Sequence, residues 1–202
     1  MTNQLKSRHI VLLGDSIFDN AAYVPDGMPV IKHLRQAIPA NWNVTLLAVD
    51  GSVTSDVPGQ MAMIPASATC LVISVGGNDA LKSIEIVRMP VSTVGEALHH
   101  LSEIRNSFQK EYRKMLMHVL SVELPVAVCT IYNTVPGIGN VEKTALALFN
   151  EIILQEAVMA KVAVIDLRIV CNEVGDYSPI SPIEPSHQGG AKIAHAIHSL
   201  LA

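Results

Sequence analysis

Five short apolar runs, rich in β-branched residues, recur along the chain and are separated by longer stretches of mixed polarity. Their hydrophobicity is nearly continuous and does not alternate, a pattern typical of strands that are covered on both faces, as in a parallel sheet. The pattern predicts strands at 9–14, 43–49, 69–76, 124–132 and 161–167.

The segments between these runs carry apolar residues at helical spacing. The predicted helices span residues 28–38, 93–121, 141–159 and 189–201. Strands that alternate with helices indicate an α/β fold with right-handed crossovers. No internal repeat, low-complexity segment or linker divides the sequence, so we expect one domain over residues 1–202.

Composition narrows the class of partner. Half of the 202 residues are hydrophobic and 16% are charged, which suits a compact domain with buried strands. A formal net charge of −4 provides no broad attraction for nucleic acid or an anionic membrane surface, so the expected partner is a small molecule. No apolar stretch approaches the roughly 18 residues that a membrane helix needs. The apolar composition is also compatible with a homodimer.

The amino-terminal segment and the cysteines suggest a compartment. The segment "MTNQLKSRHI" is polar and has neither an apolar region nor a small-residue cleavage site, so we expect no secretory signal. Cys70, Cys129 and Cys171 each lie in or just after an apolar run, which favours buried thiols over a metal or redox role. We therefore expect a protein of the reducing cytoplasm.

Polar and glycine-rich loops follow the first three predicted strands. They are Gly14-Asp15-Ser16, Asp50-Gly51-Ser52 and Gly76-Gly77-Asn78-Asp79. Ligands of open α/β sheets bind outside the carboxyl ends of the strands, so these loops are expected to meet at one edge.

The three loops contain the groups that nucleophilic catalysis needs. A serine hydroxyl such as that of Ser16 attacks a carbonyl once a base takes its proton and donors hold the developing charge. The N–H groups of Ser16 and Gly51 and the amide of Asn78 would form such an oxyanion hole. Singly, Ser16 is also explained as a helix cap and the Asn78 segment as an ordinary turn. Three such loops after successive strands favour the catalytic interpretation.

These residues resemble the SGNH hydrolase superfamily, the GDSL-type esterases and lipases. The matching blocks are Gly14-Asp15-Ser16-Ile17, the Gly51 loop and Gly76-Gly77-Asn78-Asp79, and the order of elements matches over almost the whole chain. The resemblance implies a flavodoxin-like three-layer α/β/α sandwich with a parallel five-stranded sheet in the order 2-1-3-4-5. It also implies Ser16 as the nucleophile, with Ser16, Gly51 and Asn78 as the oxyanion donors.

The last block of the family, D-x-x-H followed by P-S and a glycine, matches in two ways. In the first alignment Glu184-x-x-His187 replaces D-x-x-H, so Glu184 orients His187 and His187 deprotonates Ser16. In the second, "EPSHQG" overlies H-P-S-x-x-G. Glu184 then takes the position of the base, Ser181 that of the acid, and His187 lies one helical turn beyond.

The chemistry leaves three outcomes open for this block. Histidine in the first alignment is the usual base. A glutamate pKa near 4.3 matches an alcohol poorly at neutral pH, although burial would raise it. In the third outcome the site binds its ligand but barely turns it over. Of the other histidines, His33 lies in the first helix, where a structural role is expected, and His195 and His198 are expected to face solvent.

A second departure from the family pattern follows the serine. Asp19 and Asn20 stand where many relatives have small residues, in a 17–28 loop long enough to fold over the site. They either make a turn or, with Asp15, belong to a substrate loop. In the second case Asp19 would bring a carboxylate near Ser16 and disfavour anionic substrates.

The leading hypothesis is a serine esterase that hydrolyses small acyl esters through an acyl-enzyme on Ser16. The alternative is a non-catalytic or weakly active module that binds small molecules and has a degenerate base. Long-chain lipids fit less well, because aromatic residues make up only 4% of the chain and no extended apolar loop suggests a lid. Nucleotide-binding glycine motifs are missing, and no His/Cys cluster has metal-ligand spacing. We therefore expect no metal and no cofactor.

Overall fold

A single parallel sheet forms the centre of the computed structural model, which describes residues 7–202. Its strands follow the order β2-β1-β3-β4-β5, and every neighbouring pair is parallel, as the resemblance implied. The strands are β1 His9–Gly14, β2 Asn43–Leu46, β3 Cys70–Ser74, β4 Val126–Cys129 and β5 Ala163–Ile165. The first six residues of the amino-terminal segment, on which the expected lack of a signal partly rests, lie outside the described residues.

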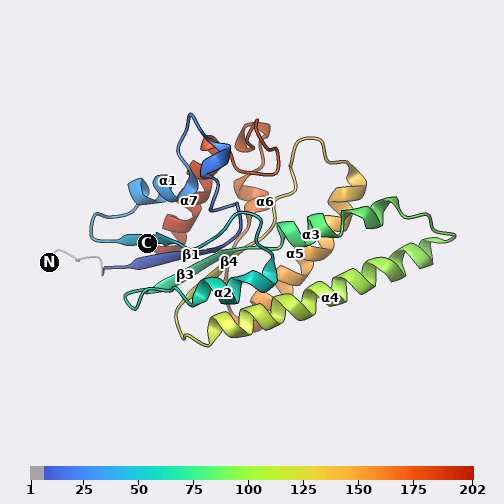
Figure 1. Ribbon diagram of the computed structural model, residues 1–202, viewed down its shortest axis with the longest axis horizontal. Helices are drawn as coiled ribbons and strands as arrows, with labels where there is room; N and C mark the ends of the chain where they lie inside the picture. The colour runs from blue at the N-terminus through green and yellow to red at the C-terminus, as the bar shows by residue number, and fades with distance from the viewer. Residues whose placement is uncertain (1–6) are drawn as a thin grey trace.

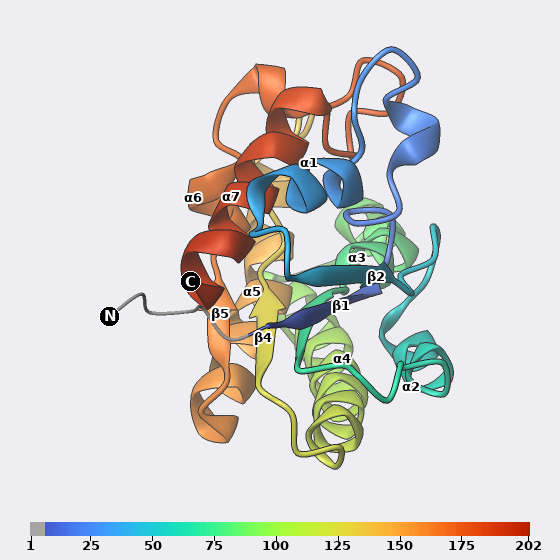
Figure 2. The same ribbon diagram turned by 90° about the vertical axis from the view of Figure 1, so that its left-hand side faces the viewer.

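Helices cover both faces of this sheet (Figure 1). Helices α1 (Val30–Ala37) and α7 (His187–Leu201) pack together on one face. Helices α4 (Val94–Leu120) and α5 (Asn140–Ala160) cover the other, and Figure 2 shows the sheet between the two layers. The predicted three-layer sandwich is confirmed.

Alternate residues of β1 explain why its sequence is continuously apolar. Ile10 and Leu12 join the core on the side of α1 and α7, whereas Val11 and Leu13 join the core on the side of α4 and α5. Successive side chains of a strand point to opposite faces, so a sheet covered twice needs apolar residues at every position.

Short helices occupy the loops at the carboxyl edge of the sheet. They are α2 (Val57–Met61), α3 (Gly77–Lys82), α6 (Leu167–Val170) and the 3-10 helices Ala21–Tyr23, Thr54–Asp56, Ile84–Arg88 and Val174–Asp176. The sequence predicted a loop at residues 76–79, but α3 begins at Gly77, directly after Gly76 at φ 120°. Asn78 therefore lies in the first turn of a helix and not in an open loop.

Other expectations for the core and the helices also have clear outcomes. Cys70, Cys129 and Cys171 are free, buried thiols, as predicted. His195 is exposed as predicted, whereas His198 is half-buried and packs edge-on against Trp42. Within residues 7–202, no helix combines the length and the apolar character needed to cross a membrane.

Candidate active site

Ser16 lies in a tight turn at the carboxyl end of β1. The backbone of this turn lies close to Ser74, the last residue of the neighbouring strand β3. Gly14 has φ 120°, and a Cβ at this position would lie 1.8 Å from the carbonyl oxygen of Ser74. The side chain of Gln60 accepts a hydrogen bond from Gly14 N–H and donates one to Gly14 C=O, each 2.8 Å long. Only glycine fits such a backbone approach, and the turn that presents Ser16 is thereby fixed.

The hydroxyl of Ser16 donates a hydrogen bond of 2.9 Å to Oε1 of Glu184. Glu184 is only 4% exposed, and its Oε2 atom is buried without a hydrogen-bond partner among the described residues. Burial raises the pKa of Glu184 to about 7, the hydrogen bond from Ser16 opposes that rise, and the charge of Asp50 adds to it. A carboxylate that titrates near neutral pH therefore contacts the serine hydroxyl.

Main-chain hydrogen bonds hold the segment that carries Glu184. Glu184 C=O accepts from Ser178 N–H at 2.8 Å, and Glu184 N–H donates to Ser181 C=O at 3.0 Å. The Tyr132 hydroxyl donates to the carbonyl of Ile183 at 2.6 Å. Tyr132 follows β4, so its hydrogen bond ties the Glu184 segment to the carboxyl edge of the sheet.

Asn20 anchors the same segment from the other side. Its side-chain amide donates to Pro185 C=O at 3.0 Å, and its side-chain carbonyl accepts from Val30 N–H at 3.0 Å. Asn20 is completely buried. It therefore joins the loop after β1 to the start of α1 and to the Glu184 segment. The sequence predicted either a turn or a substrate loop for Asn20, and neither prediction included this structural role.

His187 is the first residue of α7 and faces α1. Its Nδ1 atom accepts a hydrogen bond from Met28 N–H at 3.1 Å and lies 3.2 Å from Nε2 of His33. Burial and the neighbouring His187 lower the pKa of His33. Among residues 7–202, no hydrogen bond joins His187 to Ser16 or to Glu184. The contacts therefore match the second alignment, with Glu184 beside Ser16, and not the first.

The physical reason lies at the start of α7. The Ser186 hydroxyl caps the helix by accepting from Gly189 N–H at 3.1 Å, so the helix begins at His187, two residues before the predicted start. This start directs His187 toward α1. The position of Ser181, which the second alignment equates with the acid, supplies only a backbone carbonyl to Glu184.

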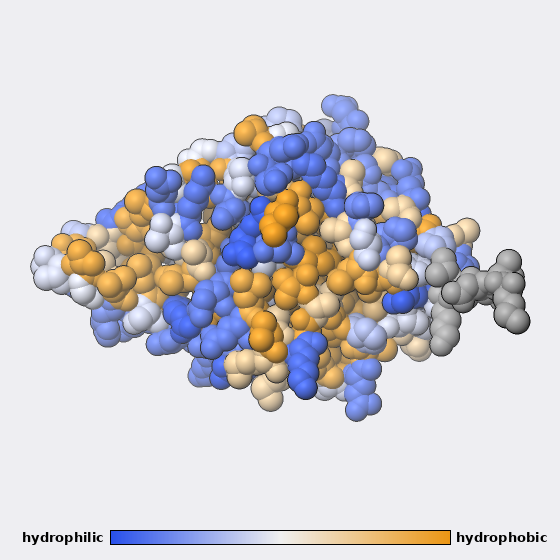
Figure 3. Space-filling view, turned by 180° about the vertical axis from the view of Figure 1, so that it is seen from behind, coloured by the Kyte–Doolittle hydropathy of each residue, from blue (hydrophilic) through white to orange (hydrophobic). Residues whose placement is uncertain are grey.

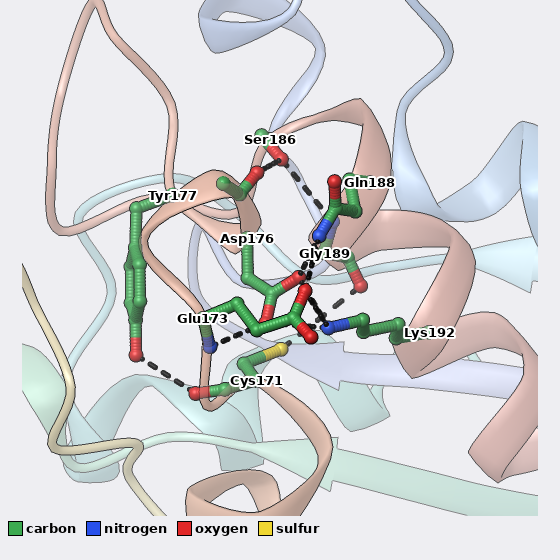
Figure 4. Close-up of polar contacts among 9 residues, drawn as sticks. Cys171, Glu173, Asp176, Tyr177, Ser186, Gln188, Gly189 and Lys192 are labelled. Carbon is green, nitrogen blue, oxygen red and sulfur yellow. Dashed lines mark hydrogen bonds and ion pairs between the residues drawn. The ribbon is translucent and has the colours of Figure 1, made fainter.

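An ion-pair cluster fixes the loop that leads into Glu184 (Figure 4). The carboxylate of Asp176, which is fully buried, lies 2.8 Å from Lys192 Nζ and accepts from the Gln188 amide at 3.0 Å. Lys192 also pairs with Glu173 at 3.0 Å. A Cβ on Gly189 would lie 2.1 Å from the carbonyl oxygen of Asp176. The glycine of this block is therefore needed for close packing of the loop against α7.

The predicted oxyanion donors lie on loops that are bonded to one another. Asn78 Nδ2 donates to Ser52 C=O at 2.9 Å, which leaves its second N–H free of that bond. Gly51 has φ 78°, and no atom lies within 4 Å of a Cβ built there. Among the described residues, no group accepts a hydrogen bond from the N–H of Ser16 or Gly51.

Asp15 and Asp19 have different environments. Asp15 is buried, its Oδ1 accepts from Ile17 N–H at 3.1 Å, and burial together with the Glu184 charge raises its pKa to about 8, against the effect of that hydrogen bond. Asp19 accepts from Asp50 N–H at 3.1 Å, and the Tyr23 hydroxyl donates to Asp50 at 2.7 Å. Asp19 thus ties the 17–28 loop to the second loop of the site.

A cavity of about 130 Å³ adjoins these groups. Asp15, Ser16, Asn78 and Glu184 line it, whereas Gly51 does not; Glu142 also lines it, and most of its wall is apolar. No local sequence pattern marks this wall, Gln60 or Tyr132, so none of them could be predicted from the sequence. Within residues 7–202, no group of three or more His, Cys, Asp or Glu side chains is placed to hold a metal ion.

Among the comparisons with known proteins, only the one with solved structures supports the fold. No protein-family model and no curated protein matches the sequence. Solved structures do match over nearly the whole chain. A lipase from a goat rumen metagenome has a TM-score of 0.73 at 20% identity and covers 95% of this chain and 96% of its own. A G-D-S-L family lipolytic protein from Veillonella parvula has 0.68 at 16%, covering 96% and 98%. An acetyl xylan esterase has 0.70 at 16%, covering 96% and 100%. This protein has the fold that those lipases and esterases share.

Proposed function

We propose that this protein is a serine ester hydrolase in which Ser16 attacks the acyl carbon and Glu184 takes the serine proton. The observation that carries the proposal is the 2.9 Å hydrogen bond from the Ser16 hydroxyl to Glu184. A general base must lie within hydrogen-bonding reach of the proton that it removes, and Glu184 meets that condition. The fold shared with lipases and esterases supports the same reaction class.

The environment of Glu184 answers the objection that a carboxylate is too weak a base. General bases work best when their pKa is close to the working pH. Burial raises the pKa of Glu184 to about 7, close to the ordinary histidine value of about 6.5. Proton transfer also neutralises the carboxylate, which relieves the cost of a charge in a buried site. Glu184 thereby performs the task that histidine has in the usual triad.

The reaction proceeds in two halves. The Ser16 oxygen bonds to the acyl carbon, its proton passes to Glu184, and the carbonyl electrons move onto the substrate oxygen. Collapse of this intermediate breaks the bond to the alcohol, which leaves with the proton from Glu184. Water then attacks the acyl-enzyme, again giving its proton to Glu184, and the acid departs as Ser16 regains a proton.

The oxyanion formed in each half is bound by three donors in this proposal. They are the N–H groups of Ser16 and Gly51 and the side-chain amide of Asn78. Removal of one such donor typically costs about 3 to 4 kcal/mol in transition-state stabilisation. Asp15 supports this arrangement, because with a pKa of about 8 it is mostly neutral at pH 7 and does not oppose the developing negative charge.

One observation favours the alternative, a module that binds small esters without efficient turnover. Oε2 of Glu184 has no hydrogen-bond partner in the described residues, so no third group orients the base as the acid does in a triad. A fluorophosphonate probe, which phosphonylates activated serines, distinguishes the two functions.

The probe is applied to the wild type, Ser16→Ala, Glu184→Gln and His187→Ala. Labelling of the wild type and of His187→Ala, with loss in Ser16→Ala and Glu184→Gln, is the expected result. Loss in His187→Ala with retention in Glu184→Gln would restore the first alignment. An unlabelled wild type would favour the binding module.

A further inference from the structure

The amino-terminal turns of α4 and α5 leave apolar side chains uncovered by the sheet. The first buried residue of α4 is Phe108, and the first of α5 is Phe149. Leu101 and Ile104 on α4 and Leu146 on α5 precede them and are only half-buried. All three line the 130 Å³ cavity, so the two helices diverge over their first turns and enclose a space between them.

That space is continuous with the proposed nucleophile. Ser16 and Glu184 line the same cavity as Leu101 and Leu146. Ile183, the residue before Glu184, contributes an apolar side chain to the wall. An acyl group bonded to Ser16 would therefore have an apolar path toward α4 and α5.

We infer that this cavity binds the acyl chain of the substrate and selects unbranched apolar chains of about six carbons over acetyl groups. This inference rests on the proposed function and refines its substrate class. A dry cavity of 150 Å³ lined by Leu, Ile and Phe holds benzene, which has six carbons, and the cavity here is of similar size with a mostly apolar wall. Each added methylene that is buried raises kcat/KM by about fourfold until the cavity is full.

The acidic residues that line the cavity determine which polar groups of a ligand it accepts. Glu184 and Asp15 both face the cavity, and either one repels an anionic head group when it is ionised. A neutral ester group fits this end, whereas a free fatty acid or a phosphorylated acyl donor fits poorly.

A thin wall sets the far end of the cavity. Val87, Leu101 and Ala145 line the cavity and also line a second, outer groove of about 420 Å³ that includes Met89 and Val91. Figure 3 shows apolar surface at this end of the molecule. Chains longer than the cavity would have to displace that wall, so the preference is expected to fall beyond about eight carbons.

The test compares p-nitrophenyl esters from acetate to dodecanoate in the wild type, Ala145→Phe and Ala147→Phe. Ala145 lines the cavity, whereas Ala147 is exposed on the same helix and lines neither hollow, which makes it a matched control. The wild type should favour hexanoate over acetate by at least about tenfold in kcat/KM. Ala145→Phe should lose that preference, and Ala147→Phe should behave as the wild type.

A folded Ala145→Phe with the wild-type chain-length profile would overturn the inference. If that variant does not fold, as judged by circular dichroism, Leu101→Trp fills the same end and is judged by the same criterion. If the wild type hydrolyses none of the esters, the proposed function fails, and methyl hexanoate binding, measured by saturation-transfer NMR, then decides the inference. Binding that Ala145→Phe loses and Ala147→Phe keeps would support the acyl site; absent or equal binding would overturn it.

Discussion

Ser16 and Glu184 share a hydrogen bond of 2.9 Å although 168 positions separate them in the chain. One end of the bond depends on the tight turn after β1, and the other on a loop held by Tyr132, Asn20 and the Asp176–Lys192 pair. Because Oε2 of Glu184 has no partner among the described residues, the charged form is costly and the protonated form is favoured. The pair is therefore suited to proton transfer.

Replacement of Glu184 by glutamine tests the base directly. Glu184→Gln keeps the shape and a hydrogen bond to Ser16 but cannot accept the proton. The expected loss in kcat is about 10²- to 10⁴-fold, the usual contribution of a positioned base. Steady-state hydrolysis of p-nitrophenyl butyrate measures it.

His187→Ala serves as the contrasting variant for that experiment. His187 bonds Met28 and His33, so its loss should leave kcat within about threefold while lowering the free energy of unfolding by about 1 kcal/mol. A kcat that falls as far as in Glu184→Gln would identify His187 as the base.

The pH profile follows from the two raised pKa values. Glu184 must be ionised to accept a proton, so kcat/KM should rise tenfold per pH unit below about 7 and level off above it. Asp15, with a pKa of about 8, adds a negative charge near the oxyanion at higher pH and should lower kcat/KM again. Because the charge of Glu184 affects the pKa of Asp15, the two apparent pKa values of the pH profile belong to the pair and not to either residue alone.

Rates measured from about pH 5 to about pH 9.5 in the wild type and in Asp15→Asn check this profile. Loss of only the alkaline limb in the variant is expected. A rate that stays flat down to pH 5 would contradict a base with a pKa near 7.

Asp15 also predicts how stability depends on pH. Its pKa rises from 3.8 in the unfolded chain to about 8 in the folded protein, so the folded state binds the extra proton between these values. The stabilising effect of that proton is fully present below about pH 4 and is lost as pH rises through about 8. Asp15→Asn removes this dependence and keeps an oxygen for Ile17 N–H.

Urea denaturation at several pH values measures the effect. Asp15→Asn is expected to exceed the wild type in unfolding free energy at pH 8.5 by on the order of a few kcal/mol, with the difference shrinking toward pH 4. A difference that does not change with pH would exclude Asp15 as its source.

Substitution of Gly189 is expected to change both the stability and the activity of the protein. A methyl group there would lie 2.1 Å from Asp176 C=O, so Gly189→Ala must displace the loop that carries Glu184 or the start of α7. We expect a loss of about 2 to 4 kcal/mol in unfolding free energy and a reduced kcat. Gly59→Ala is the control, because nothing lies within 4 Å of its added methyl, and its unfolding free energy should stay within about 1 kcal/mol of the wild type.

The sequence by itself determined the layers and the position of Ser16 at the carboxyl end of β1. Residues such as Ile10 and Val11 are apolar on both faces of β1, so burial under two helix layers could be predicted from local pattern alone. Ser16 follows that strand directly, and parallel strands end at a common edge, so its proximity to the Gly51 and Asn78 loops also followed from chain order.

Tertiary structure alone decided that Glu184, and not His187 three residues later, contacts Ser16. Their sequence fits either role, and the choice depends on the Ser186 cap and on anchors from distant segments, Tyr132 and Asn20. The apolar cavity likewise lies between α4 and α5. The periodicity of each helix predicts its apolar face but not how far the two helices lie apart. Local pattern fixes which residues are buried, but contacts between distant segments fix which polar atoms meet.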